Sequence, residues 1–198
     1  MGRLKLNDPA AMRTCTVCLR PFEPRFSTLQ SVCGLRCALK IPALERKAER
    51  AATRVAKEQQ KRLPDLRKEA QKAFNEFIHA RDADRPCICC GKWPQSDHLT
   101  GGAWDAGHYR SRGAAIDLAF NEHNVHRQLK RCNRRAWDVA GYRAELVRRI
   151  GLEAVIALEG PHPLPHYTRD DLRRIRDEYK AKVRARRIDN QEQTGAKR

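Results

Sequence analysis

The chain has 198 residues with a hydrophobic share of 40%, and its 41 Lys and Arg against 24 Asp and Glu give a formal net charge of +17. Such an excess attracts a polyanion by charge neutralisation and counterion release, so nucleic acid is the first partner we expect. No apolar run approaches the roughly 18 to 20 residues of a membrane-spanning helix, and the N-terminus lacks an apolar signal core, which argues against a membrane protein and predicts a soluble intracellular one.

Paired cysteines follow a loose basic arm at the start of the chain. Cys15-x2-Cys18 and Cys33-x3-Cys37 have the spacing at which each pair occupies two corners of a tetrahedral zinc ion. In a reducing compartment such close groups indicate metal binding rather than disulfides. They predict an N-terminal zinc-finger module over residues 1–40. The zinc either folds a module with too little core of its own or also presents arginines to DNA.

A charged connecting segment is expected over residues 41–82. The stretch from Ala43 to Arg62 contains good helix formers with charges nearly all the way round, so it predicts an exposed helix. Pro64 interrupts this helix, and Asp65 is placed to cap a second one. The second helix has an apolar stripe at helical spacing, expected to pack on the central domain and made of Leu66, Ala70, Ala73, Phe74, Phe77 and Ile78.

The segment 83–160 is the expected centre of the chemistry, because it holds the densest mixture of histidine, cysteine and asparagine. Short strands are expected at residues 103–110 and 116–120. Cys87, Cys90 and Cys132 supply three thiols for a second zinc ion. A helix with an apolar stripe follows, ended by Gly151, and then a short apolar helix through Leu158; the stripe is Tyr142, Leu146, Val147 and Ile150.

The fourth donor of the second zinc site is left open by the spacing. Cys89 is the awkward candidate, because side chains of adjacent residues in a tight turn diverge and Cys89 precedes Cys90. His126 approaches from a loop and is expected to be a ligand of zinc or of a catalytic metal. His98 is the third candidate on chemical grounds.

The C-terminal segment, residues 161–198, is expected to hold one helix and a basic tail. Three prolines from Pro161 to Pro165 predict an extended linker. Thr168 and Asp171 approximate a capping box for the last helix, whose apolar seam is Leu172, Ile175, Tyr179 and Val183. From Asp189 the tail is expected to be disordered. The elements together predict a mixed α+β fold made of small zinc-stabilised modules flanked by helices.

The central motifs have the order of an HNH, or ββα-metal, nuclease, in which a zinc knuckle fixes a hairpin against a helix. The motifs CICCG, WDAGHYR, FNEHNVHRQ, CN and YRAELVRRIG resemble the lambdoid-phage recombination family NinG, also called Rap. The likeness covers most of the chain, including the N-terminal cysteines and the charged helix that begins ALER. It implies a structure-specific endonuclease that cuts branched DNA such as D-loops and Holliday junctions with Mg²⁺ or Mn²⁺.

The resemblance also implies roles for individual residues. His108 is the expected general base, Asn124 holds the loop or orients that histidine, and Asn133 is a metal ligand. A carboxylate often precedes the base histidine, but that position is Gly107 here, so Asp105 is the proposed substitute. Asp105 and Gly107 share a strand face, and Gly107 leaves room for the carboxylate. Basic side chains expected to neutralise phosphates are Arg110, Arg112, Arg127, Lys130, Arg131 and Arg134.

Two departures from the family pattern sustain other hypotheses. After Asn133 the stretch RRAWDVAGYR replaces the family's polar stretch that contains lysine and glycine. Leu129 stands where the family has the first cysteine of its second pair. A non-catalytic zinc-containing DNA-binding protein with a degenerate site is therefore the main alternative, and a zinc-bearing RNA-binding or assembly protein is a third. Two DNA arms at a junction suit a homodimer. The resemblance places the protein in the bacterial cytoplasm, encoded by a phage or prophage, with phage or host recombination proteins as further candidate partners.

Overall fold

The computed structural model describes residues 12–27, 29–95, 102–135, 138–162 and 166–195. They fall into two compact units, Met1–Lys61 and Arg62–Arg198, so the break lies inside the charged segment 41–82. The basic arm before residue 12, His98 and the last two linker prolines lie outside the described residues. None of the helices in the described ranges is long and apolar enough to cross a membrane.

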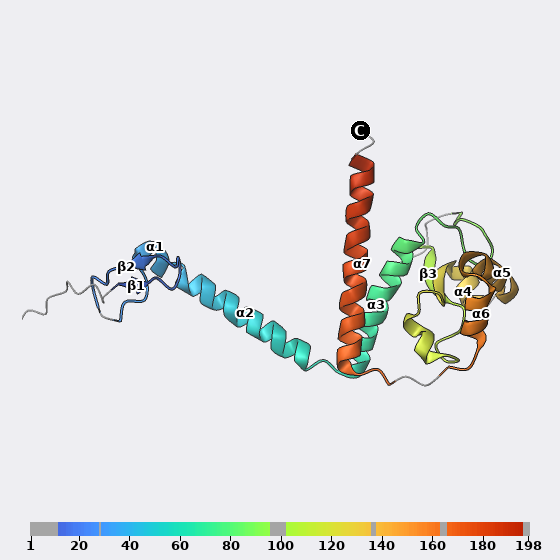
Figure 1. Ribbon diagram of the computed structural model, residues 1–198, viewed down its shortest axis with the longest axis horizontal. Helices are drawn as coiled ribbons and strands as arrows, with labels where there is room; N and C mark the ends of the chain where they lie inside the picture. The colour runs from blue at the N-terminus through green and yellow to red at the C-terminus, as the bar shows by residue number, and fades with distance from the viewer. Residues whose placement is uncertain (1–11, 28, 96–101, 136–137, 163–165, 196–198) are drawn as a thin grey trace, which may run out of the picture. The chain divides into compact units, whose positions relative to one another are not determined.

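The first unit is a small cysteine-rich module followed by one long helix (Figure 1). Strand β1 (Arg13–Thr14) pairs antiparallel with β2 (Pro21–Phe22), and α1 (Leu35–Ala38) and α2 (Ile41–Gln59) follow. Helix α2 has no buried side chain, which confirms the expected exposed helix. The module's core consists of Cys15, Phe22 and Cys37. So small a core is typical of a domain that a metal ion holds together.

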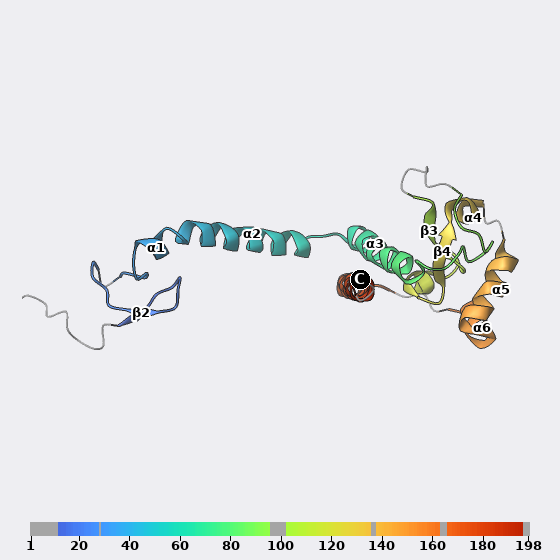
Figure 2. The same ribbon diagram turned by 90° about the horizontal axis from the view of Figure 1, so that it is seen from above.

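In the second unit, α3 (Leu63–Arg81) lies beside α7 (Arg169–Gly195) (Figures 1 and 2). The expected stripe of α3 is buried; it packs largely on α7 and, from the central segment, on Val125, Ala106 and Phe120. The Phe74 and Tyr179 rings lie 4.7 Å apart at this contact. Pairing with the α7 seam follows because both helices expose apolar residues at the same helical spacing.

The ends of these two helices test the cap predictions. Helix α3 begins at Leu63, with Arg62 in the cap position and no side-chain cap, so the prediction of Asp65 as the cap is wrong; its carboxylate lies in the first turn and pairs with Arg62. The capping box of α7 is confirmed, since Thr168 Oγ1 accepts from the Asp171 amide and Asp171 Oδ2 accepts from the Thr168 amide. The helix continues to Gly195, so the prediction of a disordered tail from Asp189 is wrong for residues 189–195.

A two-stranded antiparallel sheet and a short helix form the middle of this unit. Strand β3 (Trp104–His108) pairs with β4 (Val125–Leu129), which leads directly into α4 (Lys130–Arg135). The stretch Ile116–Phe120, expected as a strand, is instead a 3-10 helix, η2. The side-chain Nδ2 of Asn124 donates to the Leu118 carbonyl, so this carbonyl has its hydrogen bond within a turn and not with a neighbouring strand.

Helices α5 (Val139–Ile150) and α6 (Leu152–Glu159) pack against the sheet and the turn after Arg85. Gly151 ends α5 with φ of 85°, as its position after the last apolar residue predicts. The shared core of this region contains Ile88, Leu129, Leu146 and Val155.

A buried charge network joins the end of α3 to β4. Arg81 donates two hydrogen bonds to Asp82, which has no exposed surface, and a further one to the carbonyl of Val125. The Arg127 amide also donates to Asp82. These donors hold the pKa of the Asp82 carboxyl well below its usual range, although burial alone would raise it. The network fixes the strand that precedes α4.

Candidate functional site

The four N-terminal cysteines converge in the structure. Their Sγ atoms all lie within 4.8 Å of one another, with 3.7 Å between Cys18 and Cys33 and 3.6 Å between Cys33 and Cys37. Zinc–sulfur bonds of about 2.3 Å in a tetrahedron place sulfurs about 3.8 Å apart. The set of Cys15, Cys18, Cys33 and Cys37 therefore fits a structural zinc ion.

A second cluster of four thiols lies under the sheet. The Sγ atoms of Cys87, Cys89, Cys90 and Cys132 all lie within 4.8 Å of one another, with 3.6 Å from Cys87 to Cys89 and 3.7 Å from Cys90 to Cys132. The cluster has the same fit to zinc as the first one. Cys89 is thus the fourth thiol, and the expectation that adjacent cysteines diverge is wrong here.

The turn explains why both adjacent cysteines reach one centre. The Gly91 amide donates to the Cys87 carbonyl at 2.9 Å, and Gly91 has φ of 64°, which curls the chain back. The Cys87 sulfur accepts from the Leu129 amide at 3.2 Å, and the Cys89 sulfur accepts from Gln128 Nε2 at 3.4 Å. Leu129 therefore contributes a backbone donor to the cluster at the position where the resemblance implied a ligand.

The thiols have unequal acidities, and this bears on metal binding. Burial raises the pKa of Cys87, but donation from the Leu129 and neighbouring amides lowers it further than burial raises it. Burial raises the pKa of Cys89, and it raises that of Cys132 to about 11. A divalent ion that binds all four sulfurs would displace their protons, so affinity should rise with pH.

His126 does not join the thiols, which corrects its prediction as the fourth ligand. Its ring is buried; Nδ1 lies 2.9 Å from Arg81 Nη2 and 3.5 Å from Asp82 Oδ2, and Nε2 lies 3.2 Å from the His123 carbonyl. Burial lowers the pKa of this histidine. Both ring nitrogens are used in the buried network, so His126 is a structural residue.

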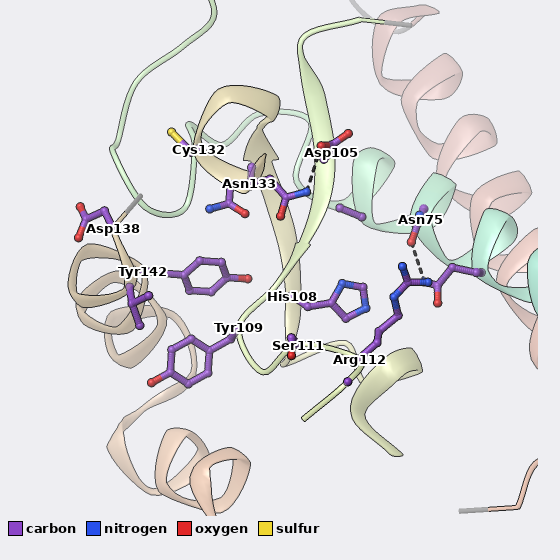
Figure 3. A pocket seen from close by; sticks show the side chains of 15 residues that line it. Asn75, Asp105, His108, Tyr109, Ser111, Arg112, Cys132, Asn133, Asp138 and Tyr142 are labelled. Atoms are coloured by element: carbon purple, nitrogen blue, oxygen red, sulfur yellow. Dashed lines mark hydrogen bonds between the residues drawn. The ribbon is translucent and has the colours of Figure 1, made fainter. Parts of the chain in front are cut away.

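The nuclease residues expected from sequence surround a cavity of about 710 Å³ (Figure 3). Its walls come from α3, β3, the turn after β3, β4, α4 and α5. Asp105, His108, Asn133 and Arg112 all line it. The pairing of β3 with β4 accounts for the convergence, since α4 follows β4 without a loop and brings Asn133 to Asp105 of β3.

Asp105 and Asn133 are joined directly. Asn133 Nδ2 donates to Asp105 Oδ2 at 3.0 Å, drawn as a dashed line in Figure 3. A carboxylate and an amide oxygen are the ligand types that Mg²⁺ and Mn²⁺ prefer. Asp105 and Asn133 therefore place two oxygen ligand types of such cations side by side at this wall of the cavity.

The space left by the missing side chain of Gly107 is occupied by Gln128, whereas Asp105 was expected there. A Cβ at this position would lie 2.1 Å from Gln128 Oε1 and 2.9 Å from Gln128 Cβ. Gln128 faces Asp105 across the sheet and lines the cavity while donating to Cys89. The space over Gly107 is thus filled by the Gln128 side chain, not by the Asp105 carboxylate.

The surroundings of His108 favour its neutral imidazole form, which can accept a proton. Its Nε2 lies 3.3 Å from the Ala119 carbonyl, which favours a proton on Nε2 and a lone pair on Nδ1. Burial lowers the pKa of the imidazole, and the positive charge of Arg112 lowers it further. The ring is therefore neutral at neutral pH, the state that a general base requires.

Asn124 has a positioning role and does not line the cavity. Its fully buried side chain donates from Nδ2 to the carbonyls of Arg110 and Leu118 at 3.1 Å each, and Oδ1 accepts from the Arg110 amide at 2.8 Å. These bonds tie the turn after His108 to η2, whose Ala119 carbonyl faces the histidine. This is the loop-holding role implied by the resemblance.

The predicted phosphate-binding cations are in different surroundings. Arg127 is corrected to a structural residue, because its guanidinium stacks 3.9 Å from the Trp104 ring and donates to the carbonyls of Asp82 and Ala83. Arg112 is exposed and lines the cavity. On α4, Arg131 and Arg134 are exposed and Lys130 is half-buried. Arg110, in the turn after β3, is also half-buried.

Sequence reasoning missed several of the lining residues, and four of them bear on the site. Tyr142 anchors β3 by donating from its hydroxyl to the Gly107 carbonyl at 2.9 Å. Gln128 contributes as described, and α3 contributes Gln71 and Asn75. The α3 amides are one turn apart and lie off the apolar stripe, and this polar pair is the sequence signal that could have indicated them.

Comparison with known proteins gives one family. The family model described as Bacteriophage Lambda NinG protein matches residues 7–189. Protein ninG of Escherichia phage 933W is 38% identical over 193 residues, covering 88% of this chain and 93% of that protein. Protein ninG of Salmonella phage P22 is 37% identical over 198 residues, covering 88% and 94%. Protein ninG of Escherichia phage lambda is 44% identical over 118 residues, covering 59% and 55%. No solved structure matches the chain.

Proposed function

Because the chain belongs to the NinG family of bacteriophage proteins, we propose that it is a metal-dependent DNA endonuclease that cuts branched recombination intermediates such as D-loops and Holliday junctions. The observation that carries the proposal is the convergence of His108, Asp105 and Asn133 on one cavity. A protein that only binds DNA has no need of a half-buried histidine of lowered pKa that shares a cavity with paired oxygen ligands.

Each residue has a defined task in the proposed reaction. Asp105 and Asn133 would hold a divalent cation, which supplies electrostatic stabilisation of the charge that develops on the phosphate oxygens. His108 Nδ1 takes a proton from water as the water oxygen bonds to phosphorus and the bond to the leaving sugar oxygen breaks. The Ala119 carbonyl holds the ring in place and stabilises the imidazolium that results.

The two thiol clusters have a structural part in the proposal. The second cluster lies under β4 and contacts Gln128, which lines the cavity, so zinc there would hold the strands that carry the site. The non-catalytic alternative rested on the altered stretch after Asn133 and on Leu129 as a missing ligand. Cys89 supplies a fourth sulfur, which removes the second reason for regarding the site as degenerate.

The direct test is cleavage of labelled D-loop, Holliday-junction and plain duplex DNA, with Mg²⁺ or Mn²⁺ and with chelator. We expect metal-dependent cutting of the branched substrates by the unaltered protein and its loss in His108→Ala. The matched control is His123→Ala, since His123 is exposed in the turn before β4 and its side chain does not line the cavity. All proteins should be compared at equal zinc content.

The other outcomes decide between the hypotheses. Equal binding of branched DNA by all three proteins without cutting would support the non-catalytic alternative. Equal cutting by His108→Ala and His123→Ala would remove His108 from the mechanism.

A further inference from the structure

A second cavity of about 640 Å³ adjoins the candidate nuclease site. It runs along the outer side of α3 and shares Gln71, Asn75 and Arg112 with the first cavity. Because three side chains border both cavities, they form one trough that leads from the surface of α3 to His108. All of the trough belongs to the second unit of the chain.

Helix α3 has two unlike sides, and the trough uses the polar one. One side is buried against α7 and Val125. The other contributes Arg67, Lys68 and Lys72 to the second cavity, with Glu76 as the acidic residue of its lining. The net positive lining matches a polyanion, and side chains four residues apart on a helix lie about 6 Å apart along its axis, as successive contacts along a chain require.

The two lysines are available to a ligand. Lys68 and Lys72 are exposed, and within the described part of the chain neither ammonium makes a hydrogen bond or ion pair. Fold stability therefore gives no reason for their placement, in contrast to Lys182 of α7, which pairs with Glu122 and Glu178.

Polar and positively charged side chains also line the place where the two cavities meet. Gln71 Nε2 donates to Asn75 Oδ1 at 2.8 Å, which orients both amides beside the site (Figure 3). Arg112 borders both cavities, and its charge acts on His108. Positively charged side chains thus extend from α3 to the edge of the proposed reaction centre, and the side-chain amides of Gln71 and Asn75 lie between them.

We propose that the outer face of α3 binds the sugar-phosphate backbone of the DNA strand that leads into the nuclease site, with Lys68 and Lys72 on successive phosphates and Arg112 nearest the phosphate that is cut. The inference rests on the proposed function, because that function supplies the reason for a strand to enter the cavity. It assigns a binding path to a helix whose sequence indicated only a packing role.

The test measures binding apart from cutting. The zinc-loaded protein is titrated against a labelled Holliday junction over a series of salt concentrations. No Mg²⁺ or Mn²⁺ is added, and the buffer contains a chelator that is too weak to remove zinc, so that binding is measured without cutting. The variant is Lys68→Ala/Lys72→Ala. The matched control is Lys180→Ala/Arg184→Ala, which removes the same charge at the same spacing from exposed positions of α7 outside both cavities.

We expect the α3 variant to raise Kd about tenfold or more and to reduce the slope of log Kd against log salt by about 1.8, since each lost phosphate contact contributes about 0.9. The control should bind as the unaltered protein does. Equal losses in both variants would show a general charge effect and overturn the inference, as would unchanged binding by the α3 variant. Tighter binding of an RNA junction of the same sequence would overturn the assignment to DNA.

The inference and the proposed function can fail separately. If the unaltered protein never cuts but only the α3 variant binds weakly, the binding path stands and the nuclease proposal falls. If the unaltered protein cuts and the α3 variant binds normally, the nuclease proposal stands and the path falls. Equal zinc content and equal thermal unfolding of the variants exclude misfolding as the cause.

Discussion

Cys89 and His126 are the two described candidates for the fourth ligand of the second metal site. The Cys89 sulfur lies among the other thiols, whereas the His126 ring is enclosed by Arg81 and Asp82. We expect Cys89→Ser to lower bound zinc from two ions per chain to one, and His126→Ala to retain two. Native mass spectrometry measures both. Loss of an ion from His126→Ala with two ions kept by Cys89→Ser would restore the sequence-based ligand set.

His108 determines the expected pH dependence of cutting. Its pKa lies below the ordinary 6.5, because the ring is buried and Arg112 is near. A general base acts in its neutral form, which persists above the pKa, so cutting should hold as pH falls to about 6.5 and decline only below it. Single-turnover rates at saturating DNA across this range measure the acid limb. A limb centred above pH 7 would contradict the assignment of His108 as the base.

Strand β3 depends on Gly107 for its fit against β4. Gly107→Ala places a methyl group against Gln128, and contact with Gln128 Cβ cannot be relieved by moving the end of that side chain. We expect a loss of about 1–3 kcal/mol in the free energy of unfolding. Urea denaturation measures it, and Gly113→Ala is the control because its nearest neighbour is Ser111 Oγ at 4.0 Å. Gln128→Gly removes the Cβ as well as the rest of that side chain, and its failure to relieve the loss in a double-mutant cycle would disprove the collision as its cause.

The junction of α3 and β4 depends on the Asp82 carboxylate. Asp82→Asn leaves Arg81 buried without its counter-charge, so we expect a loss of about 3–5 kcal/mol. Because the folded-state pKa lies below the unfolded value of 3.8, the stabilisation is present above that pH and is lost as pH falls below it. Urea titrations at several pH values measure both effects. Exposed Asp84 gives the control Asp84→Asn, and an equal loss there would contradict a special role for the network.

We expect the two units of the molecule to depend on metal to different degrees. The first unit has a core of three buried residues, whereas the second has extensive apolar clusters around α3, α5 and α7. Removal of zinc by a strong chelator should therefore unfold the N-terminal module while α3 and α7 stay folded. Limited proteolysis with mass spectrometry should find the first new cuts within residues 12–40. First cuts within α3 or α7 would contradict this order.

The sequence by itself determined what depends on local spacing and residue type. The N-terminal cysteine pairs, the apolar stripes of α3 and α7, the Thr168 capping box and the end of α5 at Gly151 all follow from intervals of a few residues. The family also followed, because its motifs are contiguous stretches of sequence. The site residues Asp105, His108 and Asn133 were named on that resemblance.

Only the tertiary structure decided which residues meet across long intervals. Cys89 joins the thiols because a turn curls it toward Cys132, and Arg127 turns inward because its guanidinium stacks on Trp104 and donates to the carbonyls of Asp82 and Ala83. The polar side of α3 became part of the trough because its opposite side packs on α7. Spacing along the chain constrains neighbours within a helix or turn, whereas these contacts depend on how separate elements pack, which local spacing does not specify.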